Sequence, residues 1–154
     1  TTGIALVEVY DAAETSSSRL TNLSARSRSG PGAERLIAGF VLRGGGGRLL
    51  IRAVAPGLVP YGVTGVLQDP RLEVRDATGV LVAESNDWED GGAAAALGVV
   101  GASVGAFPLQ PGSRDAALVV HLPAGGYTVT VSGSAGSERG VALVEVYEVP
   151  WADP

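Results

Sequence analysis

The run Asn86-Asp87-Trp88-Glu89-Asp90 gathers the side chains best suited to hold a cation, and Asp76 lies one predicted hairpin away. Ca²⁺ prefers carboxylate and amide oxygens and takes six or more of them, although this spacing is not that of the twelve-residue helix-loop-helix calcium loop. Two interpretations stay open. One is a calcium site formed by Asp76, Asn86, Asp87, Glu89 and Asp90. The other is a set of turn-forming side chains in which Asp90 caps a helix and Trp88 packs over a sheet edge.

Catalysis finds little support in the residue types. Nucleophilic mechanisms need a serine or threonine beside a base that a third group orients, and His121 is the only histidine of the chain. Strand alternation places His121 on the face opposite Val120 and Leu122, where it faces solvent or forms a structural hydrogen bond. Asp87 with Glu89 or Asp90 could in principle hydrolyse a glycoside. However, two Trp, four Tyr and two Phe provide no aromatic-rich cleft. We therefore predict no catalytic residues and a protein that is not an enzyme.

Composition narrows the other functional classes. With 154 residues and 45% hydrophobic content, the chain has enough apolar surface for one domain. The net charge of -5 argues against nucleic acid, which requires concentrated positive charge. There is no cysteine for a disulfide. We expect no membrane span, because no apolar run reaches about 18 residues. Export from the cell stays compatible with all of these features.

One segment occurs twice. Residues 3–10 read GIALVEVY and residues 140–147 read GVALVEVY, 137 positions later. The simplest interpretation is a repeat that carries its own closing strand and a copy of its neighbour's, as in a tandem array or a strand-exchanging polymer. This divides the chain into a duplicated strand (1–11), a linker (12–19), a sandwich domain (20–150) and a tail (151–154). The predicted assembly strands comprise Ile4, Leu6, Val7, Glu8, Val9, Tyr10, Val141, Leu143, Val144, Glu145, Val146 and Tyr147.

The duplicated strand is apolar on both faces, so we expect it to be covered on both sides. Only Glu8 and Glu145 interrupt this pattern. One interpretation places them near the rim of a sheet, paired across strands with an arginine such as Arg52 or Arg75. The other makes them a registry device in a joint between molecules.

Short β-rich runs alternate with Gly, Pro, Ser and Asp clusters along the whole chain. The pattern predicts an all-β, jelly-roll-like antiparallel sandwich of about nine strands. Ala93 to Leu97 favours a short helix across one end of the sandwich. The predicted strands are 4–10, 20–26, 35–42, 48–54, 71–76, 80–84, 116–122, 127–132 and 141–149.

The strings DPRLEVRDATGVLVAESNDW (69–88) and LPAGGYTVTVSG (122–133) resemble the bacterial pre-peptidase C-terminal type of β-sandwich. Segments 36–40, 50–56 and 105–109 are similar to a repeat module found near the C-termini of large secreted bacterial proteins, which often ends in an ALVEVY strand. The resemblance implies an extracellular or cell-surface accessory or repeat domain without catalysis of its own.

Two functional hypotheses follow. In the first, the chain is an extracellular structural subunit that self-associates with identical or similar repeats, through its N-terminal strand and without a cofactor. In the second, it is an accessory module that binds carbohydrate or calcium through the loops around Tyr61, Trp88 and the acidic cluster. Removal of residues 1–11 separates them, because only the first predicts loss of assembly. The sequence leaves open whether the duplicated strand is exchanged between chains or pairs within its own.

Overall fold

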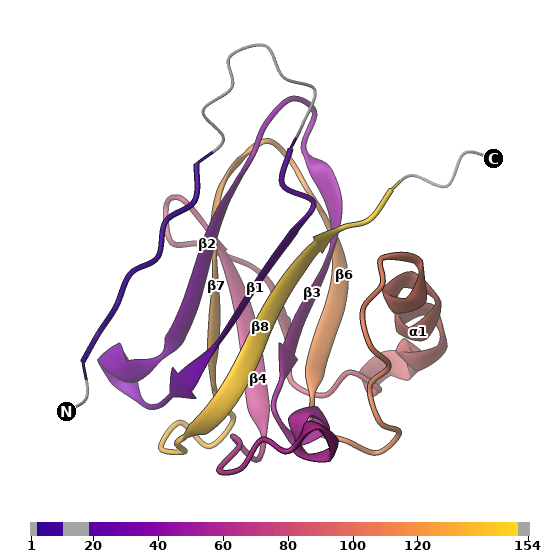
Figure 1. Cartoon of the computed structure of the whole chain (residues 1–154). Coiled ribbons are helices and arrows are strands. Elements are labelled where there is room, and N and C mark those ends of the chain that lie inside the picture. Colours follow the sequence, from indigo (N-terminus) through magenta and orange to yellow (C-terminus); the bar gives the residue numbers. More distant parts are fainter. Residues whose placement is uncertain (1–2, 11–18, 151–154) are drawn as a thin grey trace.

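The computed structural model describes residues 3–10 and 19–150 (Figure 1). Within these ranges it confirms the all-β sandwich, with eight strands and one α-helix. The predicted linker (12–19) lies outside the described residues apart from Arg19, and the predicted tail (151–154) lies outside them entirely. The elements are β1 (Asn22–Ser29), β2 (Leu36–Leu42), β3 (Gly47–Val54), β4 (Pro70–Asp76), β5 (Leu81–Ser85), α1 (Ala94–Ser103), β6 (Ala116–Leu122), β7 (Gly125–Gly133) and β8 (Gly140–Glu148).

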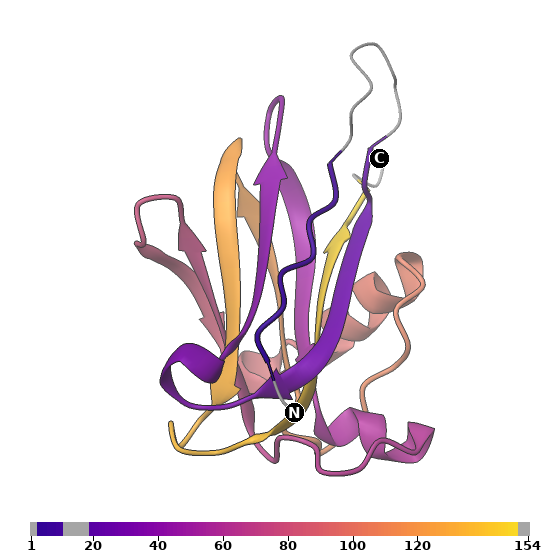
Figure 2. The same ribbon diagram turned by 60° about the vertical axis from the view of Figure 1, so that its left-hand side comes forward.

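Two four-stranded antiparallel sheets form the layers of the sandwich. The first sheet has the order β1-β8-β3-β6 and the second has the order β2-β7-β4-β5. The edge strands β1 and β2 lie on one side of the sandwich, and β5 and β6 lie on the other (Figure 2). The last strand of the chain is therefore an interior strand of the first sheet, next to the first strand.

The core lies between the sheets and follows the two-residue period of the strands. In β7, Tyr127, Val129 and Val131 are buried, whereas the threonines between them are only half-buried. Leu72 and Val74 of β4 point into the same core. This alternation explains why a sequence with few aromatic residues still fills a sandwich.

A second apolar cluster covers the outer face of the first sheet. Leu97 and Val100 of α1 pack there with Leu50, Trp88 and Tyr147. The helix is longer than predicted, because it continues through Gly98 to Ser103, and it packs on a sheet face rather than across one end. Asp90 does not cap it: the residue before the helix is Ala93, and no side chain caps the helix N-terminus.

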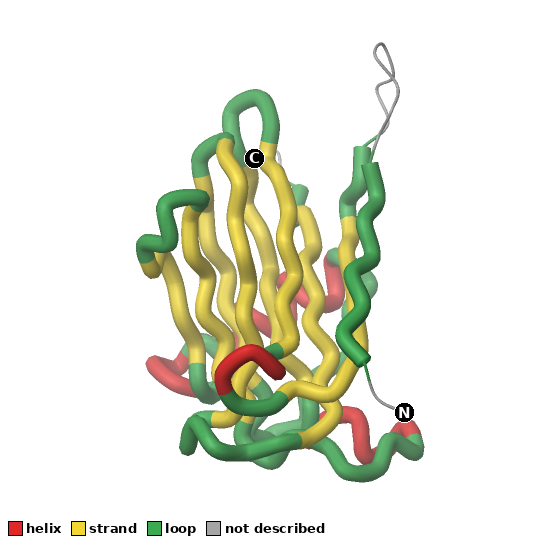
Figure 3. The backbone as a smooth tube through the Cα atoms, turned by 90° about the vertical axis from the view of Figure 1, so that its left-hand side faces the viewer, coloured by secondary structure: helices red, strands yellow, loops and turns green. Residues whose placement is uncertain are grey.

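Residues 3–10, called the arm below, are not a strand in this structure. The arm runs along the side of the sandwich where β1 and β2 are edge strands, in the direction opposite to β1 (Figures 1, 2 and 3). It pairs with neither sheet, so the prediction of a ninth strand at 4–10 is wrong for this state of the chain. Residues of suitable type form a strand only when a neighbouring strand supplies hydrogen-bond partners.

No helix among the described residues is long and apolar enough to span a membrane.

Candidate assembly site

The C-terminal copy of the duplicated segment is β8, which pairs antiparallel with β1 on one side and β3 on the other. Ala142, Val144 and Val146 point into the core between the sheets. On the opposite face Glu145 and Tyr147 are buried as well. The remaining assembly-strand residues of this copy, Val141 and Leu143, are half-buried. Coverage of both faces, predicted from the apolar pattern, is thus confirmed for this copy.

Glu145 is the centre of a buried polar cluster. Its carboxylate lies opposite Arg52 of β3, with 2.6 Å between Nη2 and Oε2, and it accepts a hydrogen bond from Arg52 Nε at 2.8 Å. The Tyr147 hydroxyl donates to Glu145 Oε1 at 2.7 Å. Burial, together with this hydrogen bond and the nearby negative charge, raises the pKa of Tyr147 to about 12. The cluster thus gives the β8 site specific requirements for a glutamate and a tyrosine two residues apart.

Arg52 is held from a second direction by the segment that follows α1. Its Nη1 donates to the Phe107 carbonyl oxygen at 2.6 Å, and the guanidinium lies 4.4 Å from the centroid of the Phe107 ring. Both the charge and the plane of the arginine therefore have partners, as a buried cation requires. Sequence reasoning missed Phe107, because 55 positions separate it from Arg52 and no local pattern joins them.

The predicted Glu145–Arg52 pair is confirmed, but its predicted position near the rim is wrong. Only 2% of the Arg52 side chain is exposed, and the pair lies between two interior strands. Arg75, the other arginine considered, lies in β4 beside Glu73 and donates to the Gly79 carbonyl oxygen at 3.0 Å.

The arm presents the same residues to solvent. The exposed fraction of its large apolar side chains runs from 64% at Val9 to 96% at Ile4, with Leu6, Val7 and Tyr10 between them. The Tyr10 hydroxyl donates to Glu8 Oε1 at 2.8 Å, which repeats the Tyr147–Glu145 contact of β8. This hydrogen bond raises the pKa of Tyr10. The two copies therefore share an internal contact and differ in their surroundings.

Asp76 and Glu89, two of the acidic residues proposed for calcium, bond different parts of the chain. Asp76 lies in the β4–β5 turn, where Oδ1 accepts hydrogen bonds from Thr78 N, Thr78 Oγ1 and Val80 N. These bonds, the one from the Thr78 hydroxyl foremost, lower the pKa of Asp76. Glu89 accepts from Gly112 N at 3.2 Å, and Asn86 donates to Asp87 at 3.3 Å. In the described ranges, no three histidine or acidic side chains gather closely enough to hold a metal ion.

The two aromatic residues proposed for ligand binding lie in different surroundings. Trp88 is 8% exposed and belongs to the cluster beneath α1. Tyr61 is exposed and packs edge-on against Phe107, with 5.2 Å between the ring centroids. Tyr61 does not line the pocket that Trp88 lines. The structure therefore does not bring these two side chains together.

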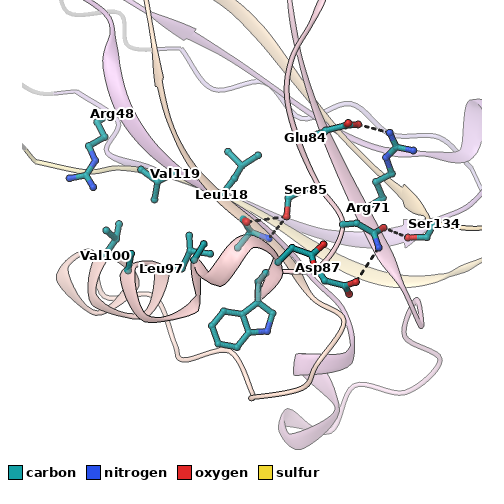
Figure 4. A pocket seen from close by; sticks show the side chains of 16 residues that line it. Arg48, Arg71, Glu84, Ser85, Asp87, Leu97, Val100, Leu118, Val119 and Ser134 are labelled. Atoms are coloured by element: carbon teal, nitrogen blue, oxygen red, sulfur yellow. Dashed lines mark hydrogen bonds and ion pairs between the residues drawn. The ribbon is translucent and has the colours of Figure 1, made fainter.

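That pocket, of about 640 Å³, lies between α1 and the β5–β6 side of the sandwich (Figure 4). Figure 4 shows Arg48 at one end and the Arg71–Glu84 ion pair at the other, with Leu97, Val100, Leu118 and Val119 between Arg48 and Ser85. Asp87 and Asp90 of the acidic cluster also line it. Much of the polar lining is already engaged, since Asn86 bonds Asp87 and Ser134, and Ser85 bonds the backbone of Ala117.

No protein-family model matches the chain, and no curated protein matches it.

Proposed function

We propose that the chain is a non-enzymatic structural module that joins units of the same fold, and that the arm is the strand through which it does so. The observation that supports this is the double use of one sequence. As β8 it is an interior strand covered on both faces, and as the arm it is extended and exposed. The extracellular fibre or tandem array expected from the sequence is the setting that we propose for this module.

The physical argument rests on the exposed apolar side chains and the unpaired backbone of the arm. Ile4, Leu6, Val7 and Val9 are exposed, and full burial of each such side chain stabilises a protein by roughly 1.5–3 kcal/mol. A strand added to a sheet edge also gains a ladder of backbone hydrogen bonds. A single unit that exposes such a segment risks uncontrolled association. A unit that uses it to bind a neighbour turns the same property into a specific contact.

The strand order limits the units with which the arm could pair. Each chain has one position between β1 and β3, and its own β8 occupies that position. If the arm of another chain displaced β8, one apolar strand would be buried and an almost identical one exposed, with no net gain. A tandem array can also offer a unit that lacks its closing strand, but between copies of this chain the arm needs a free sheet edge, so these copies should associate.

Multi-angle light scattering on the full chain and on a chain that lacks residues 1–10 tests the proposal. We expect the full chain to form dimers or larger assemblies as its concentration rises, and the truncated chain to stay monomeric with unchanged circular dichroism. A matched control keeps the arm and replaces Ile4, Val7 and Val9 by serine, which removes its apolar surface and should also abolish association. A full chain that stays monomeric at all concentrations would contradict the proposed function.

A second proposal, an accessory module that binds carbohydrate or Ca²⁺, is supported by the pocket beside α1. Its lining includes Asp87, Asp90 and Arg48, groups that can bond hydroxyls or a cation. Amide NMR spectra recorded with and without Ca²⁺, and with a panel of oligosaccharides, test it. Shifts confined to residues 84–90 and to α1 would support this proposal, and unchanged spectra would contradict it.

A further inference from the structure

The free edge of β1 is the sheet edge best matched to the arm. We propose that the arm of one molecule pairs antiparallel with β1 of a second copy, with Glu8 directly opposite Arg26. This inference rests on the proposed function and names the surface on which the partner copy receives the strand.

The backbone of β1 is available on that side. Glu148 N donates to the Thr21 carbonyl oxygen at 2.8 Å, so Thr21 faces β8. Because hydrogen-bonding direction alternates along an antiparallel strand, the N–H and C=O groups of Asn22, Ser24, Arg26 and Arg28 face away from β8. β1 pairs with no strand on that side, and no backbone hydrogen bond joins it to the arm.

The other three edges fit less well. On β6, the Ser85 hydroxyl accepts from Ala117 N at 3.2 Å and donates to the Ala117 carbonyl oxygen at 3.0 Å, so part of that edge is already occupied. β5 has five residues, fewer than the arm. β2 is long enough, but neither it nor β5 or β6 contains an arginine. Of the four edge strands, β1 alone carries arginines, at positions 26 and 28.

Charge complementarity selects the partner of Glu8. In β8, the equivalent Glu145 lies directly opposite Arg52 on the adjacent strand. Arg26 and Arg28 are exposed and form no ion pair with any residue that the structure describes. Glu8 in turn has no cationic partner among those residues and only accepts the Tyr10 hydrogen bond. Opposite charges directly across a strand pair stabilise it. The arm supplies the carboxylate of Glu8, and the β1 edge supplies the guanidinium of Arg26.

The register follows from the position of Arg26. With Glu8 opposite Arg26, Tyr10 lies opposite Ser24 and Leu6 opposite Arg28, so the arm from Leu6 to Tyr10 stays within β1. With Glu8 opposite Arg28, residues N-terminal to Val7 would extend beyond Ser29, where β1 ends. The Arg26 register therefore pairs more of the arm.

The same register places two apolar residues of the arm on the core-facing side of β1. Val7 and Val9 then share the face of β1 that carries Leu23 and Ala25, which are half-buried at the border of the core. Phe40 and Leu42 of β2 are half-buried at the same core. An added strand would thus cover the open side between the two sheets.

A second copy, rather than the chain's own arm, is the occupant for which the structure argues. The chain's own arm runs beside its own β1 edge in the required direction, and its side chains are nevertheless exposed and its backbone is unpaired (Figure 3). The β1 edge therefore stays unpaired even with the chain's own arm beside it. A chain with one free arm and one free edge forms a head-to-tail contact, which extends into fibres when it does not close into a ring.

Sedimentation velocity of charge-reversed full chains tests this proposal. E8R places arginine opposite Arg26, and R26E places glutamate opposite Glu8. We expect each variant alone to associate at least about tenfold more weakly than the wild type, because like charges directly opposite each other destabilise a strand pair. In an equimolar mixture both arm-to-edge contacts again join opposite charges, so association should return. R43E, which changes an arginine in the β2–β3 turn, is the control and should associate like the wild type.

The outcomes separate the two proposals. If the wild type associates and arm deletion abolishes this, but mixing E8R with R26E restores nothing, the β1 edge is wrong while the proposed function stands. The double variant E8R/R26E keeps opposite charges within one chain. If its arm pairs with its own β1 edge, and the mixture of the two single variants does not associate, a second copy is the wrong occupant. If the wild type does not associate at all, the proposed function itself falls.

Discussion

The arm and β8 differ at one of eight positions, where Ile4 replaces Val141, and their structures have almost nothing else in common. β8 has a hydrogen-bonded strand on each side, and its Tyr147 belongs to the apolar cluster that contains α1, whereas the arm has neither. The comparison shows that strand formation is a property of a pair of segments. The sequence supplies the capacity to pair, and the surroundings decide whether it is realised.

The charged residues of the two copies show the same contrast. Glu145 is buried with Arg52 and accepts the Tyr147 hydroxyl, while Glu8 keeps only the equivalent tyrosine contact. A glutamate in an otherwise apolar strand is costly unless a cation lies beside it. Glu8 is exposed in the arm and is solvated there, so the arm would need such a cation only if it became a buried strand as β8 is.

The most severe way to break the comparison is to remove β8 by ending the chain after Arg139. We expect residues 1–139 to fold, because the arm can occupy the position between β1 and β3, with residues 11–21 as the connection from Tyr10 to Asn22. The loss of buried Val149 should cost about 1.5–3 kcal/mol relative to the full chain. Residues 19–139, which have neither copy, should lose cooperative unfolding. Circular dichroism during a urea titration measures both, and equal behaviour of the two chains would show that the arm cannot replace β8.

The next largest effect compares the same substitution, glutamate to alanine, in β8 and in the arm. Glu145→Ala leaves Arg52 buried without its counter-charge, which should lower the free energy of unfolding by about 3–5 kcal/mol. Glu8→Ala should leave the unfolding of the dilute monomer unchanged, because Glu8 is exposed. Urea unfolding at low protein concentration measures both variants. Equal losses would mean that the arm is docked in solution.

Alkaline pH provides a smaller effect. The folded-state pKa of Tyr147 is raised to about 12 from an ordinary value of 10.0, so the folded state holds this proton more tightly than the unfolded state. The stability contributed by Tyr147 is complete below pH 10 and declines between pH 10 and 12, by up to about 1.4 kcal/mol per pH unit. Tyr147→Phe should reduce this decline, and Tyr10→Phe, in the exposed arm, should not. Unfolding free energies of the wild type and both variants, measured from pH 8 to 12, test this. An equal decline in the wild type and in Tyr147→Phe would contradict the prediction.

The smallest effect concerns the one position at which the copies differ. Val141→Ile makes β8 identical to the arm, and because Val141 is half-buried, the extra methylene should change the free energy of unfolding by less than about 0.5 kcal/mol. A loss above 1.5 kcal/mol in thermal unfolding would show that the two segments are not interchangeable in the position between β1 and β3.

Much of the sandwich could be predicted because its strands obey a two-residue period with clear turns. Residues 116–122 form β6 as predicted, and β2 begins one residue later than expected. The Glu145–Arg52 pair was accessible by the same logic, since a buried carboxylate in an apolar strand requires a cation nearby.

Other features depend on contacts between distant segments. Helix α1 continues through Gly98 and Gly101, although glycine has low helix propensity, and its Leu97 and Val100 belong to the cluster with Leu50 and Tyr147. The free β1 edge and its two arginines become meaningful only once the strand order is known. Sequence proximity says nothing of where carboxylates point. In this structure Asp76 and Glu89 accept hydrogen bonds from different backbone segments, at Thr78 and at Gly112.

Hydrogen exchange of the arm backbone tests the central claim most directly. The peptides for residues 3–10 and 140–147 differ by one methylene, so mass spectrometry separates them, and β8 provides an internal standard of protection in the same sample. The arm should exchange without protection in the dilute monomer and gain protection toward that of β8 as concentration rises. An arm that exchanges freely at every concentration, while β8 stays protected, would contradict the proposal that residues 3–10 join one unit to the next.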